Sequence, residues 1–341
     1  KGDQYIMKIV ILDGYTENPG DLSWAPLEEL GDLTVYDRTS LTNEAEIQAR
    51  IGDAEAVYTN KTPLSVATLK KAAGTLKFIG VLATGYNVVD TDAAKELGIT
   101  VCNIPTYGTA AVGQFAIGLL LEICHHIGHH NEAVRAGRWN TCPDWCFWDY
   151  PLIELENKTM GIIGFGRIGQ RTGRIAAALG MKVLAYDEHP SDSGRSIAEY
   201  TDLDTLYKES DIITLHMPLL PSTHHIINQE SIAKMKKGVI LVNCARGGLI
   251  DTEALIDGIE SMQIGALGMD TAEGEEGIIH CDRRSDIIAN RNWFYLHQFR
   301  NVIMTQHMAF YTEQAVDSMV QCGIEGIVKM TEEGAYPTML A

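Results

Sequence analysis

The segment 159–187 constrains the fold of this chain more than any other part of the sequence. An apolar run, MGIIGF, leads into a turn containing Gly164, Gly166 and Gly169, then a helix-forming stretch, then a second apolar run, KVLAYD, that ends at Asp187. In such a unit the first glycine permits a tight turn, the second lets an anion approach the backbone, and the third lets helix and strand pack closely. The pattern predicts a Rossmann-type βαβ unit with a dinucleotide at the helix N-terminus.

Asp187 supports this prediction independently of the glycines. A carboxylate at the end of the second strand can accept hydrogen bonds from the adenosine ribose hydroxyls. Its charge would also repel the 2′-phosphate of NADP, and no arginine follows it in DEHPS. A glycine-rich turn alone would be weak evidence in a chain with 32 glycines, but the strand, helix and terminal acid make it specific. The sequence therefore favours NAD over NADP.

Strand-like apolar runs alternate with helix-like segments along the chain. Before the glycine motif the runs are MKIVIL, LTVYD, EAVYT, FIGVL and ITVCN, and from the motif onward they are MGIIGF, KVLAYD, DIITLH, VILVNC, IGALGMD and NVIMTQ. Strands separated by helix-length segments form parallel sheets that are covered on both faces. The pattern predicts α/β architecture, with helices at 63–73, 91–97, 109–126, 170–179 and 312–330.

A chain of 341 residues has the length of two domains. The first predicted domain lacks the glycine motif, because its opening strand continues into LDGYTENPG. The helical segment after His307 is too short to form a domain, so we expect it to pack back on the first. The predicted bounds are 1–106 with 308–341 for a discontinuous substrate-binding domain, and 107–307 for the NAD-binding domain.

The composition excludes several classes of function. A formal net charge of −18 disfavours a surface that neutralises nucleic-acid phosphates or an anionic membrane. No apolar run reaches the roughly 18 residues of a membrane span, and the first residues lack the pattern of a signal peptide. Seven scattered cysteines without a CxxC pair indicate reduced thiols. We therefore expect a cytoplasmic protein without nucleic-acid or membrane partners.

Three polar residues follow strands of the second domain, at the sheet edge where open α/β sheets bind ligands. Arg246 follows VILVNC, Glu275 follows IGALGMD, and His307 ends NVIMTQ. Hydride reduction of a 2-oxo acid requires a cation at the carbonyl, an acid that titrates near neutral pH, and a partner for that acid. The three residues are candidates for these roles.

In these motifs the chain resembles the D-2-hydroxyacid dehydrogenase family over nearly its whole length. LATGYNVVD, NIPTYGT, FWDYPLIEL and MGIIGFGRIGQ are similar to the glycerate dehydrogenase (hydroxypyruvate reductase) branch, whereas GMDTAEGEEGI and HMAFYTEQAV are closer to the D-lactate dehydrogenase branch. The resemblance implies two Rossmann-like domains with the active site in the cleft between them, and NAD as the cofactor. It also implies a homodimer built through the cofactor domain, and a small 2-oxo acid of the hydroxypyruvate or pyruvate class as the substrate.

The resemblance also assigns roles to single residues. His307 matches the acid–base histidine, Glu275 the acid that hydrogen-bonds it, and Arg246 the arginine that binds the substrate carboxylate and carbonyl. The neighbouring Glu273 and Glu276 leave the register of the acid open. The other predicted substrate contacts are Thr84, Gly85, Tyr107 and Phe310. The predicted NAD contacts are Gly164, Gly166, Arg167, Ile168, Gly169, Asp187, Met217, Pro218, Thr223, Cys244, Ala245 and Asp270.

Two alternatives remain open at the level of sequence. His125 and His129 lie one turn apart on the predicted helix, as metal ligands do, but without an HExxH glutamate we favour a helix end and expect no metal. A regulatory protein that binds NAD(H) and acts through protein contacts would keep the same glycine motif. The intact trio favours an enzyme. The aromatic run at 145–150 is interpreted as packing near the cleft or the dimer interface.

Overall fold

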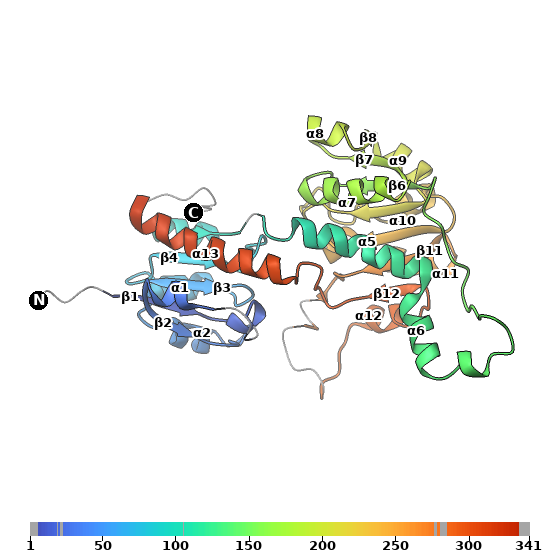
Figure 1. Ribbon diagram of the computed structural model, residues 1–341. Helices are drawn as coiled ribbons and strands as arrows, with labels where there is room; N and C mark the ends of the chain where they lie inside the picture. The colour runs from blue at the N-terminus through green and yellow to red at the C-terminus, as the bar shows by residue number, and fades with distance from the viewer. Residues whose placement is uncertain are drawn as a thin grey trace, which may run out of the picture. The chain divides into compact units, whose positions relative to one another are not determined.

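The chain divides into two compact units, which are described separately (Figure 1). The computed structural model describes residues 6–18, 20, 23–104, 106–275, 278–279 and 285–333. Unit 1 comprises Lys1–Tyr107 with Tyr311–Ala341, and unit 2 comprises Gly108–Phe310. The boundaries thus lie at 107/108 and 310/311, where the sequence predicted 106/107 and 307/308.

Unit 1 is built on a parallel sheet, whose described strands lie in the order β2-β1-β3-β4-β5. Its strands are β1 (Met7–Ile11), β2 (Gly31–Val35), β3 (Ala56–Thr59), β4 (Phe78–Val81) and β5 (Thr100–Cys102). Its helices are η1 (Gly14–Thr16), α1 (Ala25–Glu28), α2 (Glu44–Ile51), α3 (Val66–Ala72), α4 (Thr91–Glu96) and α13 (Glu313–Glu333). Helix α3 begins later than predicted because the Ser65 side chain accepts a hydrogen bond from the Thr68 N–H and caps it.

Alternate strand residues of unit 1 face opposite layers of helices, as expected for a doubly wound sheet. Val10, Val57 and Ile79 pack with α2, α3 and α4. On β3 the neighbouring residue, Tyr58, donates a hydrogen bond from its hydroxyl to the carbonyl of Gly323 in α13, at 2.9 Å. The C-terminal helix therefore returns to the first unit, beside β4 (Figure 1).

Unit 2 contains a larger parallel sheet, with the described strands in the order β12-β11-β10-β9-β6-β7-β8. Its strands are β6 (Thr159–Ile163), β7 (Lys182–Tyr186), β8 (Glu199–Tyr200), β9 (Ile212–Leu215), β10 (Val239–Asn243), β11 (Ile264–Met269) and β12 (Val302–Met304). Its helices are α5 (Thr109–His125), α6 (Ile127–Arg135), η2 (Trp139–Thr141), α7 (Arg167–Ala178), α8 (Asp192–Arg195), α9 (Leu203–Glu209), α10 (Gln229–Lys234), η3 (Gly247–Leu249), α11 (Thr252–Glu260) and α12 (Arg291–Leu296). Counted from β6, this is the Rossmann order, and the order reverses between β9 and β6, where such sheets bind ligands.

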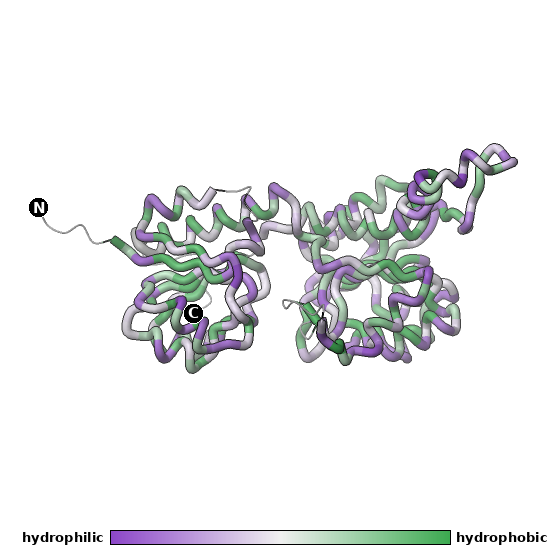
Figure 2. Tube along the Cα trace, turned by 90° about the horizontal axis from the view of Figure 1, so that it is seen from below, coloured by the Kyte–Doolittle hydropathy of each residue, from purple (hydrophilic) through white to green (hydrophobic). Residues whose placement is uncertain are grey.

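Both faces of the unit 2 sheet are buried. Ile162 and Val242 belong to one apolar cluster, which includes α5 and α7, and Ile163 and Leu241 belong to the opposite one, which includes α9, α10 and α11. In Figure 2 the central strands of each unit are correspondingly coloured as hydrophobic. The sheet is a rigid base, and its loops at the carboxyl edge are free to carry polar groups.

The sequence predicted that His125 and His129 lie on one helix, but the histidine-rich segment is divided between two helices. Helix α5 ends at His125, His126 adopts a left-handed backbone (φ 49°), and α6 follows at an angle of 58°. His125 and His129 therefore lie on different helices, and the prediction of a single turn between them was wrong. Within the described residues no single helix is long and apolar enough to cross a membrane; α5 with α6 passes that test only as a bent pair, and much of α5 is buried.

Candidate active site

The glycine turn after β6 has the geometry that its three glycines predict. Gly164 has φ 89°, and a Cβ atom there would lie 2.7 Å from the backbone nitrogen of Met217. A Cβ at Gly169 would lie 2.3 Å from the carbonyl oxygen of Gly164, so helix α7 reaches the turn only without a side chain. A Cβ at Gly166 would meet nothing within 4 Å. The middle glycine thus faces open space at the start of α7, where an anionic group can approach the backbone.

Asp187 lies beside this turn, at the end of β7. One carboxylate oxygen accepts a hydrogen bond from the Phe165 N–H at 2.7 Å, and the other accepts one from the His189 N–H at 2.8 Å. Each oxygen keeps a further lone pair for a hydroxyl donor. Arg167 and Ile168 form the first turn of α7, whose N–H groups lack acceptors within the helix. These residues fit the pyrophosphate and ribose of a dinucleotide.

The other predicted cofactor residues lie on the loops after β9 and β10. Thr223 is buried, and its hydroxyl donates to the carbonyl of Pro218 at 2.7 Å and accepts from the Leu220 N–H at 2.8 Å, so it shapes the loop that follows Met217. The Ala245 N–H is held by the Asn243 side chain at 3.0 Å. Burial raises the pKa of the Cys244 thiol far above its usual range, so this cysteine is an apolar wall and not a nucleophile.

His307 and Glu275 are hydrogen-bonded to each other across the loops after β12 and β11. Nδ1 of His307 lies 2.6 Å from Oε1 of Glu275. The second oxygen of the buried Glu275 accepts the N–H of Ala272 at 2.9 Å, which fixes the carboxylate. Glu273 instead contacts His225, and Glu276 lies outside the described residues. The geometry therefore selects Glu275 as the partner of this histidine.

Asp270 holds the turn that carries His307. Its two oxygens accept hydrogen bonds from the Thr305 hydroxyl at 2.6 Å, the Met308 N–H at 2.9 Å and the Ala309 N–H at 2.8 Å. His307 itself has a left-handed backbone (φ 53°), which is uncommon for a residue with a side chain. The carboxylate on the neighbouring strand thus stabilises a strained turn. The predicted contact of Asp270 with NAD stays a prediction.

Arg246 follows β10 and is exposed. Its guanidinium donates to the carbonyl of Ala245 at 2.7 Å, and its own carbonyl accepts from the Asn243 side chain at 2.9 Å. The next residue, Gly247, packs so closely that a Cβ would lie 2.0 Å from the backbone of Ala272. Because β10, β11 and β12 are neighbours in the sheet, their loops bring Arg246, Glu275 and His307 to one edge of unit 2.

The remaining predicted substrate residues follow strands of unit 1 or lie at the unit boundary. The Thr84 hydroxyl donates to the carbonyl of Ile104 at 2.9 Å, which leaves Gly85 at the tip of the loop after β4. Tyr107 is the last residue of this stretch of unit 1, and Phe310, the last of unit 2, packs against the α5 side of the unit 2 core.

Sequence analysis missed a buried polar network at the end of β1. Asp13 accepts hydrogen bonds from the N–H groups of Asn60 (2.9 Å), Lys61 (2.7 Å) and Thr62 (2.7 Å). Burial, and then the charge of Asp13, raise the pKa of the neighbouring Glu17 well above its usual range, and its carboxyl group accepts a hydrogen bond from the Asn60 side chain. The Asp-Gly pair after the strand was the only local signal.

Comparison with known proteins identifies the family. The family model for the NAD-binding domain of D-isomer-specific 2-hydroxyacid dehydrogenases matches residues 117–309. The chain therefore belongs to this family and is an NAD-dependent oxidoreductase that acts on 2-hydroxy acids.

Individual relatives support this assignment over most of the chain. A hydroxypyruvate reductase of Blautia hydrogenotrophica is 60% identical over 270 residues, which cover 79% of this chain and 84% of that protein. A glycerate dehydrogenase of Methylorubrum extorquens is 38% identical over 83% of this chain and 84% of its own length. Among solved structures, the pyruvate reductase of Chlamydomonas reinhardtii superposes with a TM-score of 0.86 at 32% identity, covering 96% of this chain and 97% of that one.

Proposed function

We propose that the chain reduces hydroxypyruvate to the D-2-hydroxy acid with NADH. The observation that carries this choice is the 60% identity to a hydroxypyruvate reductase over 79% of the chain. Pyruvate, with a methyl group in place of the hydroxymethyl group, is the second candidate.

In the proposed mechanism the bound NADH supplies a hydride to the carbonyl carbon. Arg246 binds the substrate carboxylate and withdraws electron density from the carbonyl oxygen, because its guanidinium offers paired donors to a planar anion. His307 donates a proton from Nε2 to that oxygen, since Nδ1 is engaged by Glu275. Glu275 fixes the orientation of the ring through its hydrogen bond to Nδ1. The oxo acid thus gains a hydride and a proton, and the reverse reaction returns the proton to His307.

We further propose that the N–H groups at Thr84 and Gly85 of unit 1 bond the substrate carboxylate, and that Tyr107 of unit 1 and Phe310 of unit 2 line the pocket. Unit 2 would hold NAD through the predicted contacts. A cytoplasmic location agrees with the free thiols of the described cysteines at 102, 124, 142, 146 and 244.

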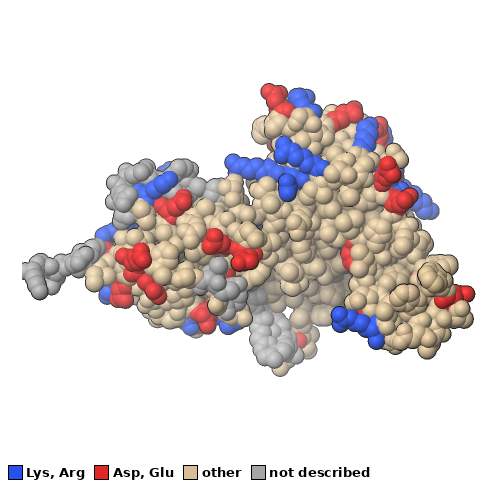
Figure 3. All heavy atoms as spheres, in the orientation of Figure 1, with Lys and Arg blue, Asp and Glu red and all other residues tan. Residues whose placement is uncertain are grey.

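A homodimer built through unit 2 is supported by the arm formed by α6, η2 and the segment 142–152, which extends from the sheet (Figure 1). Trp145 and Trp148 on this arm are 91% and 71% exposed. The arm is ordered by the paired contacts of Arg138 with Asp149, and its visible face carries few charges (Figure 3). Exposed aromatic side chains of this kind favour burial in a subunit interface. Analytical ultracentrifugation of Trp148→Glu should then show dissociation relative to the wild-type chain.

The substrate proposal is tested by following NADH oxidation with hydroxypyruvate, pyruvate and phenylpyruvate. We expect the highest kcat/KM for hydroxypyruvate, and phenylpyruvate at least about tenfold lower, because a site for a small acid excludes a ring. His307→Ala gives the background for each acid. A preference for pyruvate would transfer the proposal to D-lactate formation, and a preference for phenylpyruvate would contradict the small pocket.

A further inference from the structure

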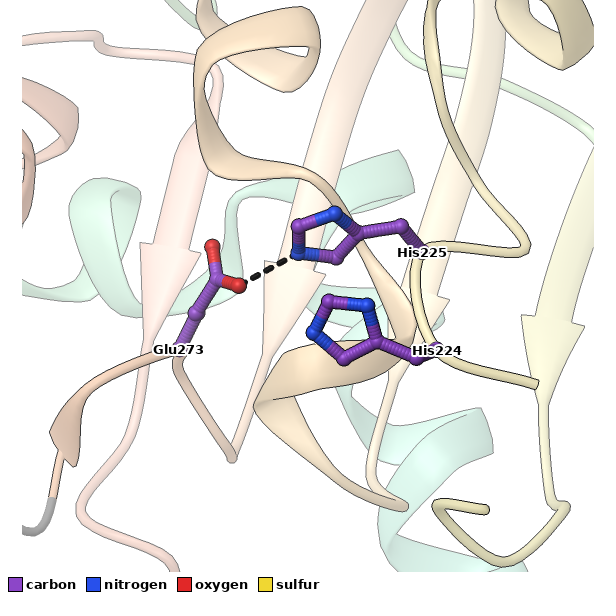
Figure 4. Close-up of side chains that lie close together, drawn as sticks. All are labelled: His224, His225 and Glu273. Carbon is purple, nitrogen blue, oxygen red and sulfur yellow. Dashed lines mark hydrogen bonds and ion pairs between the residues drawn. The ribbon is translucent and has the colours of Figure 1, made fainter. Parts of the chain in front are cut away.

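A second cluster of polar side chains joins two loops of unit 2 (Figure 4). His224 and His225 lie on the segment between β9 and α10, and Glu273 lies on the loop after β11. One ligand atom from each of the three side chains lies within 4.8 Å of the others. None of the three takes part in the hydride transfer proposed for this chain.

The three side chains converge in the manner of a half-formed coordination site. Nε2 of His225 lies 2.5 Å from Oε1 of Glu273. The rings of His224 and His225 are stacked, with centroids 3.8 Å apart and planes inclined by 28°. Figure 4 shows that both rings extend in the same direction, with their outer edges toward the side on which the Glu273 carboxylate lies. Two imidazole nitrogens and one carboxylate oxygen thus face a common point.

Neighbouring groups hold two of these ligands in place. The second oxygen of Glu273 accepts a hydrogen bond from the Thr252 hydroxyl at 2.7 Å and another from its N–H at 3.3 Å. Nδ1 of His225 faces the Asp251 carboxylate at 4.0 Å, while its backbone has a left-handed conformation (φ 52°). Metal-binding histidines and carboxylates commonly have such outer partners, which fix the orientation of the ligand atom.

The site is also open to solvent on two sides. His224 is exposed, so its ring can move without disturbing the core. A cavity of about 200 Å³ borders Glu273 and is lined by Thr252, Asn290 and Trp293. An ion therefore has an entry path and room for bound water, both of which a binding site requires.

We propose that His224, His225 and Glu273 bind one divalent transition-metal ion of the Zn²⁺ type. Two imidazoles with one carboxylate suit zinc, whereas Mg²⁺ and Ca²⁺ favour oxygen ligands. Zinc bonds of about 2.0–2.2 Å place tetrahedral ligand atoms about 3.3 Å apart, so the 2.5 Å contact between His225 and Glu273 must widen by about an ångström as the ion replaces their hydrogen bond. The ion would connect the loop that carries Thr223 to the loop that carries Glu275.

The proposal is tested by titrating demetallated, untagged protein with Zn²⁺ in a calorimeter and with Co²⁺ by visible absorption. We expect one site per chain and at least about tenfold weaker binding in His224→Asn and in Glu273→Gln, because each removes one ligand. His129→Asn is the matched control, since His129 also pairs with a carboxylate, Asp149, at 2.6 Å.

Zn²⁺ binding that is equal in the wild-type protein and both cluster variants, or no binding of either ion up to millimolar concentration, would overturn the proposal. Because His224 is exposed, His224→Asn should fold normally, so its result stands even where Glu273→Gln unfolds. The same titrations would be unaffected by failure of the hydroxypyruvate assignment.

Discussion

The two units differ in the loop that follows the first strand of each sheet. In unit 2, β6 leads into a turn whose middle glycine faces open space, and the first turn of α7 leaves N–H groups for an external anion. In unit 1, β1 leads to Asp13, whose carboxylate accepts the N–H groups of residues 60, 61 and 62. Unit 2 can thus bind an external anion after its first strand, whereas in unit 1 the carboxylate of Asp13 already occupies the N–H groups there. Similar parallel sheets therefore do not imply similar ligands.

The two regions also differ in their buried titratable groups. Beside Asp13, burial raises the pKa of Glu17 well above its usual range. In unit 2 the backbone of His216 lies against Gly164, and burial lowers the pKa of the His216 imidazole to about 4. Its Nδ1 atom is buried without a hydrogen-bond partner among the described residues. Burial thus favours the protonated form of an acid in unit 1 and the unprotonated form of a base in unit 2.

The largest expected effect concerns the chemistry assigned to unit 2. His307→Ala and Arg246→Lys should each lower kcat by roughly 10²-fold or more, because one removes the proton donor and the other the paired contact with a carboxylate. NADH affinity, measured by fluorescence titration, should remain close to that of the wild type. Turnover within a few-fold of the wild type in His307→Ala would show that the acid lies elsewhere.

The network of unit 1 is tested by Asp13→Asn. An amide has one acceptor oxygen where the carboxylate has two, so buried N–H donors lose a partner, and we expect a loss of about 2 kcal/mol in the free energy of unfolding. Denaturant unfolding followed by circular dichroism measures this loss. Asp53→Asn is the control in the same unit, because Asp53 pairs with Lys8 on the surface and should contribute nothing measurable. Equal stability of the two variants would mean that the Asp13 network is not stabilising.

The two units should respond to pH in opposite directions. His216 has a lowered pKa in the folded state, so its contribution to the free energy of unfolding is present above pH 6.5 and is lost as the pH falls towards 4. The loss amounts to about 2 kcal/mol at pH 5. Glu17 has a raised pKa, so its contribution is present below pH 4.5 and lost as the pH rises through the folded-state value. Calorimetric melting of His216→Gln and Glu17→Gln measures both. His216→Gln should remove the loss of stability at low pH, and Glu17→Gln should remove the loss of stability as the pH rises. A change in the same direction in both variants would refute the contrast between the two units.

The smallest effect concerns the middle glycine. Gly166→Ala should leave the melting temperature unchanged, because the added methyl group meets no atom within 4 Å, but it should weaken NADH binding by about tenfold, since the methyl occupies the space of the pyrophosphate. Gly74→Ala in unit 1, where a Cβ also meets nothing within 4 Å, is the control and should change neither quantity. Unchanged NADH affinity in Gly166→Ala would place the pyrophosphate elsewhere.

Much of this arrangement could be predicted from sequence because its signals are local. The glycine turn and Asp187 lie within one βαβ unit, and each apolar run that was interpreted as a strand forms one. Strand β8 was missed because two residues at a sheet edge leave no periodic pattern. The helix end near residue 126 was predicted, but helix α6 directly after the left-handed His126 was not, because a change of direction between two helices leaves no local pattern in the sequence.

Contacts between distant segments could not be predicted. Asp13 and its acceptor role depend on donors 47 to 49 positions away, and Asp-Gly after a strand looks like an ordinary turn. His225 and Glu273 are 48 residues apart and meet only because their loops leave the same edge of the unit 2 sheet. For the same reason the sequence favoured Glu275 but left the register open to Glu273 and Glu276, and the contact of Glu275 with His307 could be seen only in the structure.

Gly247 contacts the backbone of Ala272, and Asp270 accepts hydrogen bonds from the segment 305–309. These contacts have a consequence for protein engineering. Interlocked loops of unit 2 carry Arg246, Glu275 and His307, so the spacing among these three residues does not depend on the loops of unit 1. Under the proposed function, loop exchange around residues 84–85 should therefore change the substrate preference without altering the Glu275–His307 pair. By contrast, inserting one residue between β10 and η3 is expected to abolish the catalytic activity of every such loop-exchange variant.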